Sequence, residues 1–181
     1  DVGPGQRTAK PGALAAPVIT ALSCSSLERI VQEAATAAIS SFGTSMTGSP
    51  FVNGSIRLHG EFEEKIADFY GRESALVFTT GYQVNLALGS ALLGAENSVA
   101  VVDRSVHASI YDGVRLGQAA GGRMVRFRHN SAVSLERALS KLADNESALV
   151  MTDGVFSSEG DIAKLDELIP VVHRYGARFF L

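Results

Sequence analysis

The stretch SVAVVDRSVHAS, residues 98–109, indicates the fold class most clearly, because an apolar strand there passes through polar residues directly into a helix. The same alternation continues on both sides of this stretch. Near-continuous apolar strands separated by amphipathic helices are typical of an α/β fold with a mostly parallel sheet flanked by helices on both faces. We predict strands over 74–78, 98–102, 124–127, 148–152 and 177–181, and helices over 82–93, 106–119, 135–142 and 165–173.

Residues 1–72, before this alternation, show no predicted strand. Ser25 and Glu28 fit a capping box for a helix whose apolar residues run to Ile39, and Gly43 is a suitable stop. Residues 43–60 are rich in Gly, Ser and Thr and predict a long loop, and a second helix should end at Gly71. We therefore expect an N-terminal arm over 1–20, N-terminal helices with a substrate-entrance loop over 21–72, and the first part of a large cofactor-binding domain over 73–181.

Composition and charge narrow the class of protein. The chain has 181 residues, 46% of them hydrophobic, enough for one domain with a core, and its formal net charge of −3 gives no electrostatic footprint for nucleic acid. One cysteine, Cys24, fits a reducing compartment, and no apolar run is long enough to span a bilayer. We expect a soluble, cytoplasmic protein. Because the last residues, 176–181, read as a buried strand just beginning, we also expect a piece of a longer chain, incomplete at the C-terminus.

Three polar segments follow predicted strands, where ligands of open α/β sheets bind. They are 79–83 (TTGYQ), 103–109 (DRSVHAS) and 153–161 (DGVFSSEGD). Each also has an ordinary structural interpretation, as a helix cap, a core histidine or a polar turn. Together they fit a phosphorylated, planar cofactor: a helix N-terminus for the phosphate, His107 for stacking and Ser157 for a hydrogen bond. No spacing of potential ligands indicates a metal site.

At these segments the sequence resembles the α-oxoamine synthase family of fold-type-I pyridoxal-phosphate (PLP) enzymes. The resemblance covers the chain from about Ser26 to Leu181. The motifs that carry it are FGTS (42–45), NG (53–54), LHGEFE (58–63), ALVFTTGYQVN (75–85), Asp103, HAS (107–109), FRHN (127–130) and GVFSSEGD (154–161).

The resemblance implies a role for each candidate residue. Gly81 and Tyr82 bind the phosphate of PLP through backbone N–H groups, His107 stacks on the pyridine ring, and Ser157 lies near its phenolic oxygen. Asp153 stands where the family usually has Glu. Asn53 and Ser55 help to shape the substrate entrance, and His59 either matches a family position or simply caps the second helix.

The implied reaction joins an amino acid (Gly, Ala or Ser) to an acyl thioester, from acyl-CoA or an acyl-carrier protein, usually with loss of carbon dioxide. PLP is the implied cofactor, and a homodimer the implied assembly. The chain departs from the family in lacking an Asn-Tyr-Leu-Gly segment before Ser26, and the residues that bind the ring nitrogen and the catalytic Lys would follow Leu181.

Two other readings stay open. A non-catalytic partner subunit of a serine palmitoyltransferase-like heterodimer would carry the same motifs without the lysine, although intact His107 and Ser157 favour catalysis. Another fold-type-I enzyme, such as an aminotransferase or a C–S lyase, is disfavoured by segment 154–161.

Overall fold

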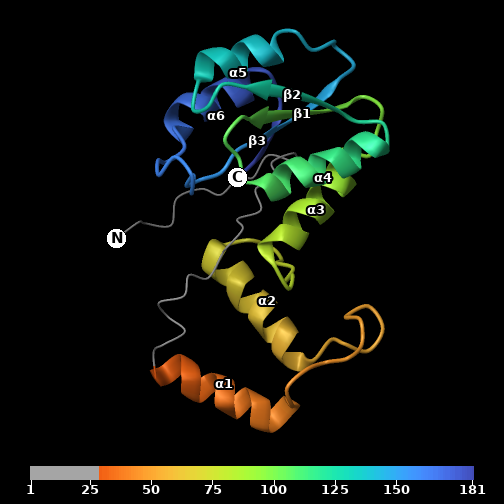
Figure 1. The fold of residues 1–181 in the computed structure, drawn as a ribbon, viewed down its shortest axis with the longest axis vertical. Coiled ribbons are helices and arrows are strands. Elements are labelled where there is room, and N and C mark those ends of the chain that lie inside the picture. Colours follow the sequence, from red (N-terminus) through yellow and green to blue (C-terminus); the bar gives the residue numbers. More distant parts are fainter. Residues whose placement is uncertain (1–28) are drawn as a thin grey trace. The chain divides into compact units, whose positions relative to one another are not determined.

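The computed structural model describes residues 29–181, which form two compact units, 29–79 and 80–181 (Figure 1). The predicted arm over 1–20, Cys24 and the capping box of Ser25 and Glu28 lie outside the described residues. No helix between residues 29 and 181 is long and apolar enough to cross a membrane.

Unit 80–181 is built on a four-stranded sheet in the order β2-β1-β3-β4, with every neighbouring pair parallel. The predicted fold class is confirmed, and the boundaries moved by only one to three residues. The strands are β1 (Ser98–Asp103), β2 (Arg123–Phe127), β3 (Ser147–Met151) and β4 (Arg178–Phe180), and the helices are α3 (Gly81–Leu92), α4 (Ala108–Ala119), α5 (Ala132–Leu139) and α6 (Leu165–Arg174).

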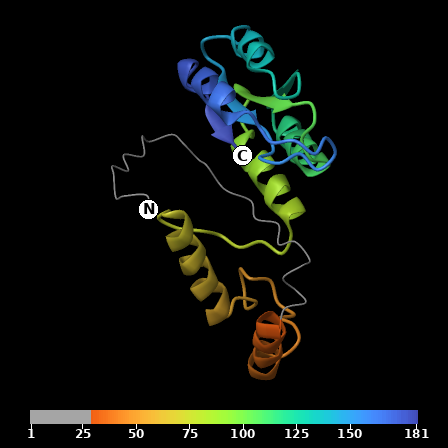
Figure 2. The ribbon, with the colours of Figure 1, turned by 90° about the vertical axis from the view of Figure 1, so that its left-hand side faces the viewer.

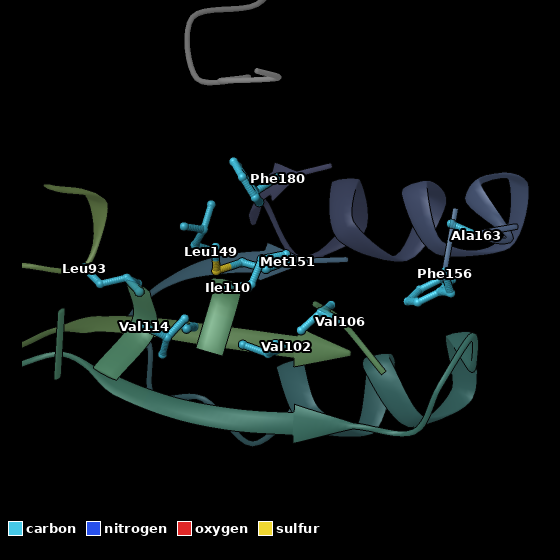
Figure 3. Close-up of a cluster of buried hydrophobic side chains, with 11 residues drawn as sticks. Leu93, Val102, Val106, Ile110, Val114, Leu149, Met151, Phe156, Ala163 and Phe180 are labelled. Atoms are coloured by element: carbon cyan, nitrogen blue, oxygen red, sulfur yellow. The ribbon is translucent and has the colours of Figure 1, made fainter. Parts of the chain in front are cut away.

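Helices cover both faces of the sheet (Figures 1 and 2). Alternate residues of the central strand β1 supply two cores, one on each face. Ala100 and Val102 pack with Ile110 and Val114 of α4, and Figure 3 shows this cluster continuing to Phe156 beyond the end of β3. Val99 and Val101 pack on the opposite face, against residues of α5 and α6. Because both faces are covered, β1 is buried along its whole length, as its apolar sequence indicates.

Helices α3 and α4 pack against each other through glycines. A Cβ on Gly113 would lie 2.2 Å from the carbonyl oxygen of Asn85, and a Cβ on Gly89 would lie 2.3 Å from the backbone carbon of Gly113. Only glycine allows backbones to approach so closely. This contact places the N-terminal half of α3 beside the N-terminal half of α4.

Unit 29–79 contains α1 (Arg29–Phe42) and α2 (Arg57–Tyr70). Helix α1 ends where predicted, at Gly43 with φ of +83°, and Gly71 ends α2 in the left-handed conformation. The predicted loop over 43–60 is too long, because α2 already begins at Arg57. The ring of His59 explains the early start: its Nδ1 accepts the backbone N–H of Ile56 at 3.3 Å, which supports the capping role.

The predicted strand over 74–78 is wrong: the segment is irregular in the structure. A strand exists only where a second strand takes up its backbone hydrogen bonds. Here the N–H of Val77 instead donates to Oε1 of Glu63 at 3.0 Å, and no strand is present among residues 29–79. Apolar residues alone therefore led to the wrong prediction.

Candidate cofactor site

The candidate site lies at the carboxyl edge of the sheet, where β1 and β3 are neighbours. From β1 the chain crosses to β2 on one side, and β3 then lies on the other side of β1. Such a reversal of strand order opens a crevice between the loops that follow the two central strands. The segments after β1 and β3, which carry His107 and Asp153, therefore meet at this point.

His107 is fixed through its backbone and its ring. Its N–H donates to Oδ2 of Asp153 at 2.7 Å, which joins the two loops. Its Nδ1 is the cap of α4, 3.2 Å from the N–H of Ser109 and 2.6 Å from the Ser109 hydroxyl. Because the backbone N–H can only donate, Nδ1 is an acceptor, and a neutral ring must carry its proton on Nε2.

Ser109 is itself held from α3. The side-chain amide of Asn85 donates to Ser109 Oγ at 2.7 Å, inside the glycine-mediated contact of the two helices. The Ser109 hydroxyl therefore accepts from Asn85 and is free to donate to His107. The other amide atom, Asn85 Oδ1, is buried and has no hydrogen-bond partner among the described residues. The chain Asn85–Ser109–His107 sets the orientation of the imidazole.

The N-terminus of α3 supplies the second part of the site. Thr80 caps this 12-residue helix, with its hydroxyl accepting the N–H of Gln83 at 3.2 Å. The N–H groups of Gly81 and Tyr82 have no acceptor among residues 29–181. Free N–H groups at the positive end of a helix dipole bind anions, above all phosphate.

The Tyr82 side chain points its hydroxyl to α4. It donates to Oδ2 of Asp112 at 2.5 Å, and Arg115 contacts the other carboxylate oxygen at 2.6 Å. The hydrogen bond from Tyr82, followed by that from Arg115, holds the pKa of Asp112 below its ordinary value. The same bond raises the pKa of Tyr82, so the phenol remains a donor. This contact ties the first turn of α3 to α4 a second time.

The loop after β3 supplies the third part. Burial raises the pKa of Asp153, although the N–H of His107 opposes this effect. The loop closes on itself through an antiparallel bridge between Val155 and Ile162 and a 2.9 Å bond from the N–H of Phe156 to the carbonyl of Asp161. Phe156 is fully buried, whereas Ser157, the next residue, is exposed. The hydroxyl of Ser157 is therefore accessible to a ligand.

Five of the predicted site residues thus belong to one unit: Gly81, Tyr82, His107, Asp153 and Ser157. Asn53 and Ser55 belong to the other unit, in a closed turn. The Ser55 hydroxyl donates to the carbonyl of Pro50 at 2.9 Å, and Asn53 donates its N–H to Ser49 at 3.1 Å. Their predicted role at a substrate entrance stays a prediction.

His129 belongs to the FRHN motif (127–130) but has no predicted role of its own. Its ring lies between the carboxylates of Asp103 and Asp161, at 3.0 Å and 3.1 Å. Its position directly after a predicted strand could have indicated a role, because this places His129 at the same edge of the sheet as His107.

The parallel sheet with its strand order, the fixed His107 and the free N-terminus of α3 are features of a PLP-dependent transferase of fold type I. Comparison with known proteins leads to the same class. The family profile described as "Aminotransferase class I and II" matches residues 22–181. Serine palmitoyltransferase of Sphingomonas paucimobilis is 43% identical over 140 residues, which are 77% of this chain and 32% of that protein. An 8-amino-7-oxononanoate synthase of Geobacter sulfurreducens is 42% identical over 147 residues, or 81% and 37% of the two chains.

Solved structures give the same picture. A serine palmitoyltransferase variant from S. paucimobilis, with a bound PLP–myriocin aldimine, superposes with a TM-score of 0.80 at 38% identity, over 85% of this chain and 38% of that one. The 8-amino-7-oxononanoate synthase of Francisella tularensis gives 0.65 at 26% identity, over 81% and 39%. The chain belongs to the aminotransferase class I and II family and, within it, to the PLP-dependent α-oxoamine synthases. It spans about a third of the length of these relatives.

Proposed function

We propose that the complete protein containing this chain is a PLP-dependent C-acyltransferase. It would join an amino acid, Gly, Ala or Ser, to the acyl group of acyl-CoA or an acyl-carrier protein, and release carbon dioxide to give an α-aminoketone. The observation that carries this proposal is the fixed imidazole of His107 at the switch point of the sheet, next to the free N-terminus of α3. The names of the relatives, serine palmitoyltransferase and 8-amino-7-oxononanoate synthase, support the same reaction class.

The residues at the sheet edge fit PLP. Gly81 and Tyr82 have N–H groups without acceptors among the described residues, as a phosphate requires. His107 is exposed, and its Nδ1 is already occupied, so a face of the ring is available for stacking on a pyridine. Ser157 has an accessible hydroxyl for the phenolic oxygen. When bound, PLP supplies an electron sink that stabilises negative charge on the α-carbon of the amino acid.

The residues of this chain would contribute binding and orientation. His107 would hold the ring plane, with Asp153 fixing the His107 backbone and Ser109 fixing its imidazole. Holding reactants in one geometry replaces the entropy cost of an encounter between free molecules. Asn53 and Ser55 would shape the entrance for the amino acid or the acyl chain. Residues 73–181 would form the first part of the large PLP-binding domain, preceded by the helices and entrance loop of 21–72 and the arm of 1–20.

We expect the protein to act as a homodimer in the cytoplasm. Unit 29–79 supports an interface, because α1 has no buried residue and large apolar side chains such as Phe51 and Phe69 are 97% and 80% exposed. Light scattering of the complete protein would show twice the mass of one polypeptide, and a monomer that is fully loaded with PLP would contradict this expectation.

The test of function uses the complete protein with PLP, an amino-acid panel and acyl-CoA of increasing length. We expect a spectral change of bound PLP with one of Gly, Ala or Ser, and release of CoA and carbon dioxide with that amino acid only. His107→Phe keeps an aromatic face and should retain more PLP affinity than His107→Ala, with His173→Ala, at an exposed histidine of α6, as the matched control. A folded protein that binds no PLP would instead indicate a non-catalytic partner subunit.

A further inference from the structure

The imidazole of His129 bridges two carboxylates from different parts of the chain. Nδ1 lies 3.0 Å from Oδ1 of Asp103, at the end of β1, and Nε2 lies 3.1 Å from Oδ2 of Asp161, in the loop after β3. Ionised carboxylates can only accept hydrogen bonds, so both ring nitrogens must carry a proton. The ring in this position is therefore an imidazolium cation between two anions.

Asp103 is the firmly held end of this arrangement. Its side chain is completely buried, and its two oxygens also accept the backbone N–H groups of Ser105 and Asn130, each at 2.9 Å. Asp161 is the weaker end, because its side chain is 45% exposed. The ring of His129 also meets the buried Phe156 edge to face, with centroids 4.4 Å apart. The imidazolium is thus bonded to a buried carboxylate, that of Asp103, on one side. On the other side it is bonded to the carboxylate of a surface loop, that of Asp161.

Asn130, the next residue, holds the same loop through uncharged side-chain hydrogen bonds. Its backbone has φ of +50°, a conformation that Asn tolerates better than most residues. Its side-chain amide donates to Oδ2 of Asp161 at 2.9 Å and to the carbonyl of Ile162 at 3.0 Å, and its Oδ1 accepts the N–H of Lys164 at 3.0 Å. His129 and Asn130 together therefore hold both sides of the loop after β3.

We propose that His129 is a positioning residue, a cationic clasp that locks the loop 153–163 to the ends of β1 and β2. The same loop carries Asp153, which anchors His107, and Ser157, so the clasp would set the geometry on which the proposed cofactor function rests. His129 itself touches neither of these residues among its described contacts; it acts through the loop.

The clasp predicts how the loop responds to pH. Burial lowers the pKa of His129, but the hydrogen bonds that its ring donates to Asp103 and Asp161 outweigh burial and raise this pKa above the ordinary value of 6.5. A histidine with a raised folded-state pKa stabilises the fold fully below pH 6.5, and this contribution is lost as pH rises through the raised value. Deprotonation leaves a lone pair facing a carboxylate, and Asp161 should separate, because Asp103 keeps two other donors.

Asp103 and Asp161 are the charged groups in contact with the ring. Among residues 29–181, the other charged side chains on the surrounding segments form no hydrogen bond or ion pair with this ring; they are Arg104, Arg128, Asp153, Glu159 and Lys164.

Hydrogen–deuterium exchange of the complete protein, measured without PLP or substrate, tests the clasp. At pH 6.5, His129→Gln and Asp161→Asn should each raise exchange in peptides of 153–163 by about tenfold or more, since each loses a charge-assisted hydrogen bond. Peptides of β1 should not change. His173→Gln, the same substitution at an exposed histidine of α6, should exchange like the wild type.

A second arm follows pH from 6 to 9, with exchange corrected by an unstructured reference peptide. The wild-type loop should lose protection as pH rises, and Asp161→Asn, which has already lost the charged contact, should show no such additional loss. The proposal would be overturned if the loop of Asp161→Asn exchanged as slowly as that of the wild type. It would also be overturned if exchange in β1 rose as much as exchange in the loop in both variants. If exchange rises only in 153–163 in the variants, but the protein binds no PLP, the clasp is supported and the proposed function is refuted. The two proposals can therefore fail separately.

Discussion

The contact between α3 and α4 predicts a large effect of Gly113→Ala. An added Cβ would lie 2.2 Å from the carbonyl oxygen of Asn85 and 2.9 Å from its carbonyl carbon, both backbone atoms that no rotamer change can move. Reaching an ordinary contact requires the helices to separate by about 1 Å. That shift would also break the 2.7 Å hydrogen bond between Asn85 and Ser109.

The magnitude follows from opposing terms. Overpacking costs about 1–3 kcal/mol and a lost hydrogen bond about 1 kcal/mol, while replacing a helical glycine by alanine contributes up to about 1 kcal/mol. The net loss of about 1–3 kcal/mol should lower the urea midpoint of the complete protein by an amount on the order of 1 M. Because His107 depends on Ser109, PLP affinity should fall as well.

Gly60→Ala is the matched control for this prediction. Gly60 also lies inside a helix, α2, but its Cβ would meet no atom within 4 Å. Urea unfolding should show Gly60→Ala at or slightly above the wild-type midpoint. If Gly113→Ala also unfolds at or above the wild-type midpoint, the close glycine contact is not what holds these helices together.

Three further predictions concern single side chains. Ser109→Ala removes the donor to His107 and should weaken PLP binding by roughly fivefold, about 1 kcal/mol, in an absorbance titration; unchanged affinity would show that the backbone N–H of Ser109 suffices. Asp153→Asn should accelerate amide exchange of His107 without lowering the unfolding midpoint at pH 7, because a carboxyl whose folded pKa is raised opposes folding once it ionises. Glu146, whose pKa Arg123 lowers to about 2, stabilises the fold above about pH 4.5 and loses this contribution as pH falls toward 2. Acid unfolding of Glu146→Gln should therefore begin at higher pH, and coincident acid curves would contradict the pairing.

Much of unit 80–181 could be predicted from the sequence because local patterns determine it. Strand β1 has an unbroken apolar run, residues 99–102, and leads into a helix, which predicts a strand buried on both faces. The rule that ligands bind beyond the carboxyl ends of parallel strands then selects the segments of His107 and Asp153. It selects the segment of Gly81 only through a predicted strand, 74–78, that is absent from the structure. The hydrogen bond from His107 to Asp153 joins two of those segments in the structure.

The remainder depends on distant contacts that no local pattern contains. Segment 74–78 has strand-like residues but no strand partner in its unit, and α2 begins early because the ring of His59 caps it. The carboxylates on His129 lie 26 and 32 residues away along the chain. Their meeting depends on the order of the strands, which the alternation of elements leaves open.

The most direct test of the central claim is an absorbance scan of the complete protein with PLP, before and after borohydride, followed by peptide mass mapping. We predict a visible band at one PLP per polypeptide that borohydride fixes irreversibly to a single lysine. A folded protein that develops no band, and carries no modified lysine after reduction, would contradict a PLP-dependent acyltransferase and leave the non-catalytic partner subunit as the explanation.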